Sequence, residues 1–323
     1  MTFVRGRSIL LALFISVLIW LVVQHDDDHN AHQERETISR HTRELMSCTH
    51  QLKSVPSEHF QRELHFLVSN EDDYRSWYTS LHQRGGVYLG VGAEQNYLLA
   101  AWTRADHVIL VDYDVQIHDV HRLYHFFFTH HTTLASFNRQ WTRPLSRKLE
   151  LEFHLFLGSW LMRHYPSVPL QAKLQWIHEM RQFFITMYPL VQHRMRSLRT
   201  LYEEYQTPTF LTQETQYQHI RGLWERGSVH QFCADVTQEY SWEELNSFLL
   251  NLVSKPISIF KVMYLSNLMQ YQPLSPEAWS VIKTTSWAQE SHVLYTWGER
   301  NISDRHSGSS SQYQYYIKSF ASP

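Results

Sequence analysis

The stretch VYLGVGAEQNYLLAAWTRADHVILVDYD, residues 87–114, decides the fold of this chain. An apolar run ends in Gly90-Val91-Gly92, a segment compatible with a helix follows, and a second apolar run leads to Asp112. Parallel strands need a crossover between them, which is usually a helix. The order strand, glycine turn, helix, strand therefore predicts one unit of a parallel sheet.

The spacing of Gly92 and Asp112, 20 positions apart, predicts a nucleoside-like ligand. Glycine lets the backbone approach a ligand because it has no Cβ to collide with it. A carboxylate can accept two strong hydrogen bonds from the vicinal diol of a ribose. The third glycine of a dinucleotide fingerprint would fall at Gln95, so a mononucleotide-type ligand is favoured. The alternative is that Gly90 and Gly92 only turn the chain and Asp112 only caps the next segment.

Strand-like runs recur along the chain, and segments with helical spacing separate the early ones. This alternation favours an α/β fold with a mostly parallel sheet and helical crossovers on its faces. The last two runs are joined by GERNISDRHSGSSSQ, which is too loop-like for a helix, so we expect that pair to be antiparallel. The expected strands are 87–90, 107–112, 229–235, 258–265, 291–297 and 312–319.

More than a hundred residues separate Asp114 from Gly227, and they are rich in aromatics with helical spacing. We expect a large helical insertion at about 119–226, in which Pro189 should kink or end a helix. Such an insertion can cover a ligand, recognise an acceptor or only enlarge the core, and the last is favoured unless polar groups converge on the pocket. The expected helices are near 35–53, 57–69 and 72–83, and within the insertion near 119–136, 146–165, 169–206 and 213–226.

Composition limits the function classes. The 323 residues suit one large domain or two small ones, and 43% hydrophobic residues are enough for a substantial core. A net charge of −2 argues against nucleic acid as a partner, because bulk binding to it needs a positive field. The 22 histidines include His121 and His125, one helical turn apart, but zinc needs three or four converging ligands. We therefore expect no metal site.

The N-terminus predicts a membrane anchor. Residues 9–23, ILLALFISVLIWLVV, follow Arg5 and Arg7, and their twelve Leu, Ile, Val or Phe residues favour insertion by about −5 kcal/mol. No small-x-small cleavage site follows, so an uncleaved, single-pass signal anchor over residues 1–24 is favoured over a cleaved signal. The arginines then stay cytoplasmic, and the globular part is extracytoplasmic, in a periplasm or lumen. We expect residues 25–54 to form a linker and an N-terminal helix, and residues 55–323 to form the globular domain.

The two cysteines leave the compartment open. Cys48 lies in a helix-like segment and Cys233 in an expected buried strand. A disulfide is allowed in an oxidising compartment, but we expect a buried free thiol at Cys233.

Polar residues follow four of the expected strands. Open parallel sheets bind ligands beyond the carboxyl ends of their strands, so these four ends are the candidate site. For Asp235 the alternative is a cap on the helix that starts near Ser241, or a turn, and for Asn267 it is an Asx turn. The four ends are Gly90–Asn96, Asp112–Asp114, Asp235–Thr237 and Ser266–Asn267.

The glycine turn, Asp112 and the later strands resemble a class I S-adenosylmethionine-dependent methyltransferase. More closely, three segments resemble an uncharacterised bacterial family with a methyltransferase-like fold. That resemblance covers roughly residues 55 to 320 and implies a Rossmann-like fold with a helical insertion. The three segments are GGVYLGVGAEQNY (85–97), YQHIRGLWERGSVHQFCADVT (217–237) and VMYLSNLMQY (262–271).

The methyltransferase resemblance also implies a cofactor and its site. Gly90 and Gly92 would line the methionine end of S-adenosylmethionine, Asp112 would hold the ribose, and Asp235 the adenine amino group. The usual third glycine falls at Glu94. Asn267 would orient the methyl acceptor, which the sequence does not identify, and is the candidate catalytic residue. The candidate binding residues are Gly90, Gly92, Glu94, Gln95, Asn96, Asp112, Asp114, Asp235 and Ser266.

Two other function classes stay open. Asp112-Tyr113-Asp114 resembles the metal and sugar-nucleotide site of GT-A glycosyltransferases, which are often membrane-anchored, and that agrees with the expected anchor. The glycine turn has no role in that interpretation. A non-catalytic binding protein on a methyltransferase-like fold is the third class. S-adenosylmethionine is made in the cytoplasm, so methyl transfer conflicts with an exported domain.

Overall fold

The computed structural model describes residues 50–51, 67–252, 260–268, 274–284, 287–298 and 313–320. The expected anchor, residues 1–24, lies outside the described residues, as does most of the segment 25–54. Among the residues that are described, no helix is long and apolar enough to cross a membrane.

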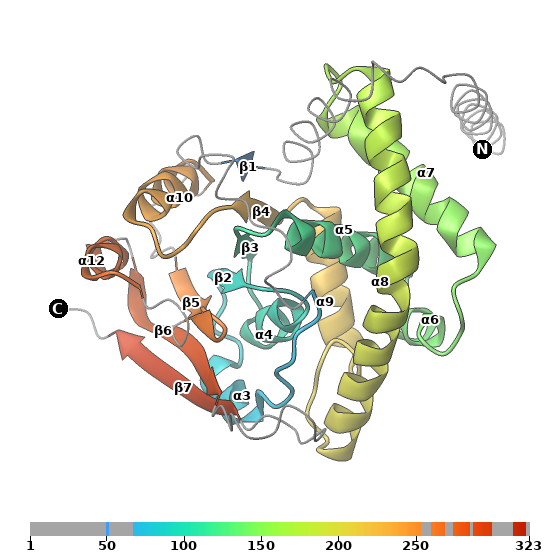
Figure 1. Ribbon diagram of the computed structural model, residues 1–323. Helices are drawn as coiled ribbons and strands as arrows, with labels where there is room; N and C mark the ends of the chain where they lie inside the picture. Colours follow the sequence, from blue (N-terminus) through green and yellow to red (C-terminus); the bar gives the residue numbers. More distant parts are fainter. Residues whose placement is uncertain are drawn as a thin grey trace, which may run out of the picture. The chain divides into compact units, whose positions relative to one another are not determined.

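A seven-stranded sheet organises the chain (Figure 1). Its order is β1-β4-β3-β2-β5-β6-β7; the first six strands pair in parallel, and β7 is antiparallel to β6. The expected α/β fold, mostly parallel sheet and antiparallel last pair are confirmed. The strands are β1 His50–Gln51, β2 Val87–Val91, β3 His107–Asp112, β4 Val229–Cys233, β5 Phe260–Tyr264, β6 Trp287–Gly298 and β7 Tyr313–Phe320.

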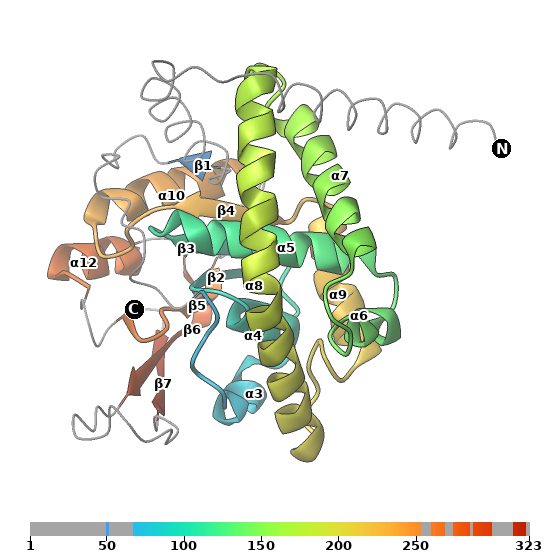
Figure 2. The same cartoon turned by 45° about the vertical axis from the view of Figure 1, so that its right-hand side comes forward.

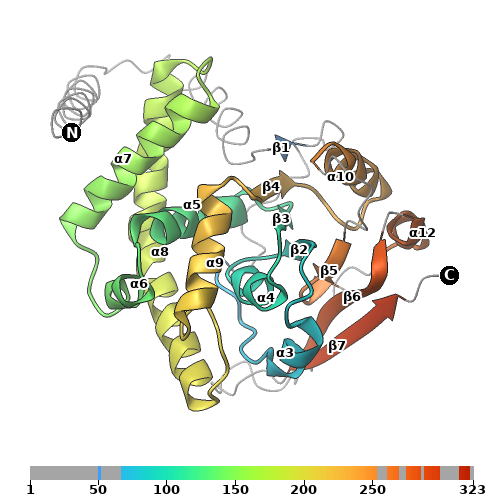
Figure 3. The ribbon, with the colours of Figure 1, turned by 180° about the vertical axis from the view of Figure 1, so that it is seen from behind.

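Helices cover both faces of this sheet, because its central strands are apolar on both sides (Figures 1 and 3). One face packs Leu89, Ile109 and Val111 against α10 (Glu239–Leu252) and α12 (Pro276–Thr284). The other face carries α4 (Gln95–Thr103), with α3 (Arg75–Leu81) and α9 (Glu214–Glu225) beside it. Successive side chains of a strand point to opposite faces, and Tyr88 accordingly points to α4.

The expected helical insertion lies between β3 and β4. Its helices are α5 (Val115–His130), α6 (Leu134–Gln140), α7 (Arg147–His164), α8 (Leu170–Glu204) and α9. One predicted helix, 119–136, is two helices, because Thr133 caps α6 in a capping box with Ser136. Pro189 was expected to kink or end a helix; α8 continues through it, so it does not end the helix.

The chain divides into two compact units, which we describe separately. The described part of the smaller unit, 145–189, holds α7 and the first part of α8, which run side by side as an antiparallel pair (Figure 2). Phe153 contacts Phe184, and Trp160 stacks on Trp176, along their length. The larger unit, residues 47–144 and 190–323, holds the whole sheet.

Two expectations near the N-terminus are corrected. Residues 50–51 belong to β1 and not to a helix over 35–53, because they pair in parallel with Phe232 and Cys233 of β4. Cys233 is fully buried, as expected, but it is disulfide-bonded and not a free thiol. The other cysteine of the chain, Cys48, precedes β1 by two residues and lies outside the described residues. A two-residue pairing such as β1 leaves no periodic pattern in a sequence, so this strand was not predictable.

Candidate functional site

Four neighbouring parallel strands end at one edge of the sheet, which we call the carboxyl edge. Val91 of β2 lies beside Val111 of β3 in the register, and Asp112 lies beside Cys233 of β4. β5 pairs with β2 on the other side. The structure therefore brings together residues that are far apart in sequence, which are, in sheet order, Asp235, Asp112, Gly92 and Ser266.

The order in which the chain adds strands to the sheet reverses at β2. From β2 the chain passes through α4 to β3 on one side, whereas β5, reached later through α10, lies on the other side of β2. In open α/β sheets, ligands bind outside the carboxyl ends of the strands where the strand order reverses. The glycine turn lies at that point.

The glycine turn is held by the side chains that follow it. A Cβ on Gly90 would lie 1.8 Å from Asn96 Oδ1, so this glycine makes room for Asn96. The Asn96 amide donates to the carbonyls of Gly92 (2.9 Å) and Ala93 (3.0 Å) and accepts from the Tyr88 hydroxyl (2.8 Å). Gly92 has φ +88°, which favours glycine. The close approach predicted at Gly90 is thus made by the chain itself.

Gln95 lies over the other glycine. A Cβ on Gly92 would lie 2.5 Å from Gln95 Nε2, which also donates to the Val91 carbonyl (3.4 Å). Gln95 Oε1 is buried and has no hydrogen-bond partner among the described residues. A buried acceptor without a donor is costly, so this oxygen can receive a donor from a ligand.

Two buried histidines of α5 fix the backbone of this edge. His121 Nε2 lies 2.8 Å from the Gly92 carbonyl and its Nδ1 lies 2.8 Å from the Tyr97 hydroxyl, while His118 Nε2 lies 3.0 Å from the Asp112 carbonyl. A carbonyl only accepts, so Nε2 carries the proton in both rings. Sequence reasoning missed both roles; their signal was a histidine pair with i, i+3 spacing just after an expected strand.

Burial keeps these rings neutral. Burial, with the neighbouring His118 acting in the same direction, lowers the pKa of His121 to about 3. Burial also lowers the pKa of His118. Neutral imidazoles donate from Nε2 at any physiological pH, so the carbonyls of Gly92 and Asp112 stay fixed.

Asp112, Tyr113 and Asp114 make the next part of the edge acidic. Asp112 is 3% exposed, and its Oδ1 accepts from the Asp114 N–H (2.9 Å). Asp114 Oδ1 caps α5 by accepting from the Gln116 N–H (2.8 Å). Tyr113 is half-buried, and burial together with Asp112, Asp114 and Asp235 raises its pKa to about 12. A neutral phenol therefore lies among three carboxylates.

Asp235 ends the row next to β4. Its Oδ1 accepts from the N–H (2.9 Å) and the hydroxyl (2.6 Å) of Thr237. This is an Asx turn, as one of the sequence interpretations expected. The side chain is half-buried, so the turn presents it at the carboxyl edge.

Glu71, which sequence reasoning missed, holds together the β5 side of the carboxyl edge. It is 1% exposed and accepts from the hydroxyls of Tyr264 (2.6 Å), Ser266 (2.9 Å) and Thr296 (2.8 Å). Burial raises its pKa, and these hydrogen bonds oppose that shift. The Ser266 hydroxyl is therefore used by the chain, and Ser266 has φ +53°. Asn267, which follows, is half-buried.

Glu94, another expected binding residue, is fully buried against Arg194 of α8. Arg194 Nε donates to Glu94 Oε1 (2.6 Å), and the Ser69 N–H donates to Glu94 Oε2 (3.2 Å). Arg194 also donates to Asp72 and to the Glu71 carbonyl. Burial disfavours the charged guanidinium, but Glu94 and Asp72 outweigh it and raise the pKa of Arg194. No sequence pattern predicted this pair, whose members are 100 positions apart.

The comparison with known families covers all of these residues. The chain matches the family described as Domain of unknown function (DUF7790) over residues 66–323. The chain belongs to this family. A comparison with curated proteins finds no match. The DUF7790 region includes the carboxyl edge, the helical insertion and the contacts of Glu71 and Arg194.

Within the described part of the DUF7790 region, no group of three or more His, Cys, Asp or Glu residues could hold a metal ion. What its carboxyl edge offers is acceptors: carboxylates at Asp112 and Asp235, and the unpartnered Gln95 Oε1. Such an edge suits an uncharged or cationic ligand with several donors, such as a ribose diol, an exocyclic amine or an ammonium group.

Proposed function

We propose that this chain binds S-adenosylmethionine at the carboxyl edge and transfers its methyl group to an acceptor. One observation carries the proposal: Gly92 and Asp112 end neighbouring parallel strands where the strand order reverses, and His121 and His118 fix their carbonyls. Asp112 would accept from the ribose diol, and Asp235 from the adenine amino group. The half-buried ring of Tyr113 supplies an apolar surface between them.

The acceptors of the edge fit this cofactor. S-adenosylmethionine carries a cationic ammonium group and a cationic sulfonium beside its carboxylate, and the charged side chains described at the edge, Asp112, Asp114 and Asp235, are all acidic. Gln95 Oε1, buried without a partner in the described residues, would accept from the ammonium. Glu94 would act indirectly, because its carboxylate already binds Arg194.

The protein's part in methyl transfer would be positioning. The bound sulfonium supplies the electrophilic methyl group. Asn267 would orient the acceptor, because its amide offers both a donor and an acceptor next to the strand that flanks Gly92. Glu71 would hold the preceding turn through the Ser266 hydroxyl. Alignment of this kind contributes on the order of 7–11 kcal/mol to a reaction barrier.

The glycosyltransferase interpretation is not carried forward. One oxygen of Asp114 caps α5, so the second carboxylate that a metal site would need already has a structural role. The disulfide of Cys233 nevertheless favours an oxidising compartment, where S-adenosylmethionine is not made. The test must therefore compare both ligands.

Calorimetry of the full chain with S-adenosylhomocysteine tests the proposal. Asp112→Asn should weaken binding by about 10- to 100-fold, because a hydrogen bond to a charged group contributes about 1.5–3 kcal/mol. Asp106→Asn is the matched control, since it makes the same change at the exposed amino end of β3 and should leave binding unchanged. Equal affinities in wild type and Asp112→Asn would contradict the proposed site. Binding of a sugar nucleotide with Mn²⁺, without S-adenosylhomocysteine binding, would replace the proposal with glycosyl transfer.

A further inference from the structure

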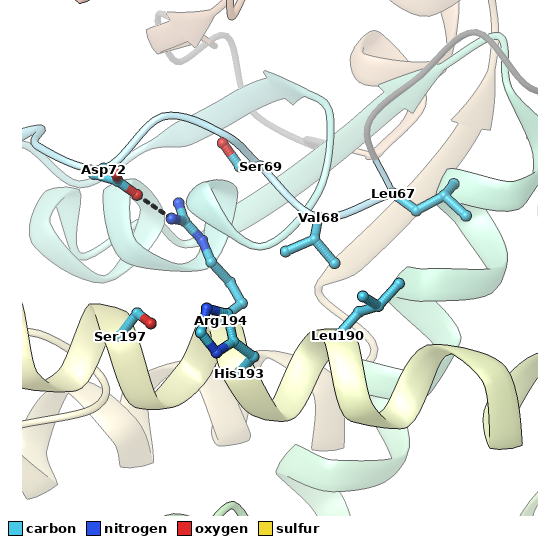
Figure 4. Close-up of a pocket in the computed structure, with 8 residues that line it drawn as sticks. All are labelled: Leu67, Val68, Ser69, Asp72, Leu190, His193, Arg194 and Ser197. Carbon is cyan, nitrogen blue, oxygen red and sulfur yellow. Dashed lines mark hydrogen bonds and ion pairs between the residues drawn. The ribbon is translucent and has the colours of Figure 1, made fainter. Parts of the chain in front are cut away.

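A second site is suggested by an open pocket of about 560 Å³ between residues 67–72 and α8 (Figure 4). None of the predicted binding residues lines it. Its volume lies within the range of pockets that hold small organic ligands, about 300–1,000 Å³. The lining residues are Leu67, Val68, Ser69, Asp72, Leu190, His193, Arg194 and Ser197.

The pocket has an apolar and a polar end. Figure 4 shows Leu67, Val68 and Leu190 together at one end, whereas Asp72 and Arg194 face each other at the other. Leu190 is 54% exposed, so it offers apolar surface at this end of the pocket. The lining therefore suits a molecule with an apolar body and one polar head.

The charges at the polar end select the head. Arg194 donates from Nε to Glu94, from Nη1 to Asp72 and from Nη2 to the Glu71 carbonyl, so each of its nitrogens already serves the protein. One guanidinium faces two carboxylates, which leaves a net charge of −1 at this end. The Asp72 side chain is 62% exposed, and its Oδ2 has no partner among the described residues. An anionic head would be repelled, whereas an ammonium would pair with Asp72.

We propose that this pocket binds an amphipathic amine, with its ammonium on Asp72 and its apolar body against Leu67, Val68 and Leu190. The proposal does not depend on methyl transfer, because none of its contacts belongs to the carboxyl edge. Glu94 connects the two places: it accepts from Arg194 and from the Ser69 N–H of the pocket wall, and it stands two residues after Gly92.

Three probes that differ only in their heads test the charge argument: octylamine, octan-1-ol and octanoate, titrated into the full chain by calorimetry. Octylamine should bind at least tenfold more tightly than octan-1-ol, and octanoate more weakly than both. Asp72→Asn should reduce the preference for octylamine over octan-1-ol at least fivefold. Equal binding of octylamine and octanoate would overturn the proposal.

A blocking variant tests the position. Ser197 lines the pocket from an exposed site of α8, so Ser197→Trp should fill it without touching the Arg194 ion pairs and weaken octylamine binding at least tenfold. Thr200→Trp, at an exposed site of the same helix outside the lining, is the control and should bind normally. Normal octylamine binding by Ser197→Trp would place the amine elsewhere and refute the site. S-adenosylhomocysteine titrations of the same variants should be unchanged, which separates this proposal from the first.

Discussion

His121 can donate to Gly92 and accept from Tyr97 at the same time only as the neutral Nε2–H tautomer. Protonation would put a second proton on Nδ1, which faces the Tyr97 hydroxyl inside the protein. The glycine turn therefore depends on His121 staying neutral, because the folded chain has no place for its second ring proton. This dependence makes the stability of the site sensitive to acid.

We expect the full chain to lose stability as the pH falls below 6.5. The pKa of His121 is about 3 in the folded chain and about 6.5 when unfolded, so between these values the unfolded chain binds more protons. Each such histidine contributes up to about 1.4 kcal/mol per pH unit, and the lowered pKa of His118 adds to it in the same direction. Glu71, whose pKa is raised, opposes the trend.

Urea unfolding at pH 7, 6 and 5 measures this effect, with His121→Gln as the comparison. Glutamine keeps a donor for the Gly92 carbonyl but does not titrate. The free energy of unfolding of His121→Gln should therefore fall less steeply as the pH falls than that of the wild type. Parallel slopes for the two proteins would show that His121 is not the group responsible.

The sequence predicted which residues lie at the carboxyl edge better than it predicted what their side chains contact. Gly92, Asp112 and Asp235 could be placed at one edge because each follows an apolar strand of a parallel sheet. Glu71 and Arg194 could not, since their partners lie 100 or more positions away and follow no period. The role of Asn96 was also hidden, because nothing in a sequence shows that its amide fills the space above Gly90.

Elements were easier to predict than residues. The central strands of the sheet are buried on both faces and read as short apolar runs, which is why their positions agree with expectation to within a few residues. Helices of the insertion were recovered from their apolar spacing. The exceptions follow from local chemistry: a capping box starts α6, and α8 tolerates Pro189, which costs it a hydrogen bond but does not end it.

The same substitution should have opposite effects in two of these elements. In β2, the Cβ of Gly90→Ala would lie 1.8 Å from Asn96 Oδ1 and 2.7 Å from the Tyr88 hydroxyl oxygen, so Asn96 must leave the turn. We expect a loss of about 2–4 kcal/mol from overpacking and broken hydrogen bonds. In α7, Gly158→Ala meets nothing within 4 Å and should add about 0.5–1 kcal/mol, because alanine favours a helix. Thermal unfolding of both variants checks the two signs, and a stable Gly90→Ala would contradict the packing described for the turn.

At the scale of the whole molecule, Cys233 of the sheet is disulfide-bonded. Cys233 lies beside Asp112 in the register and beside Gln51 of β1, so the bond is adjacent to the carboxyl edge. Disulfides persist in oxidising compartments and are rare in the cytosol. This bond therefore supports the expectation, drawn from the apolar N-terminus, that the globular part is extracytoplasmic.

Reduction should lower the free energy of unfolding by about 2–4 kcal/mol, because it removes a constraint on the unfolded chain. Urea unfolding of the full chain with and without a phosphine reductant measures this change. Cys233→Ala should have the same free energy of unfolding as the reduced protein, and the reductant should not change it. The compartment is tested on the same residue: intact cells are denatured directly in a thiol-blocking reagent, so that a buried but reduced Cys233 also reacts. Because a cytosolic chain would keep its thiols reduced, mass spectrometry that finds Cys233 alkylated would contradict an exported domain and remove the main obstacle to methyl transfer.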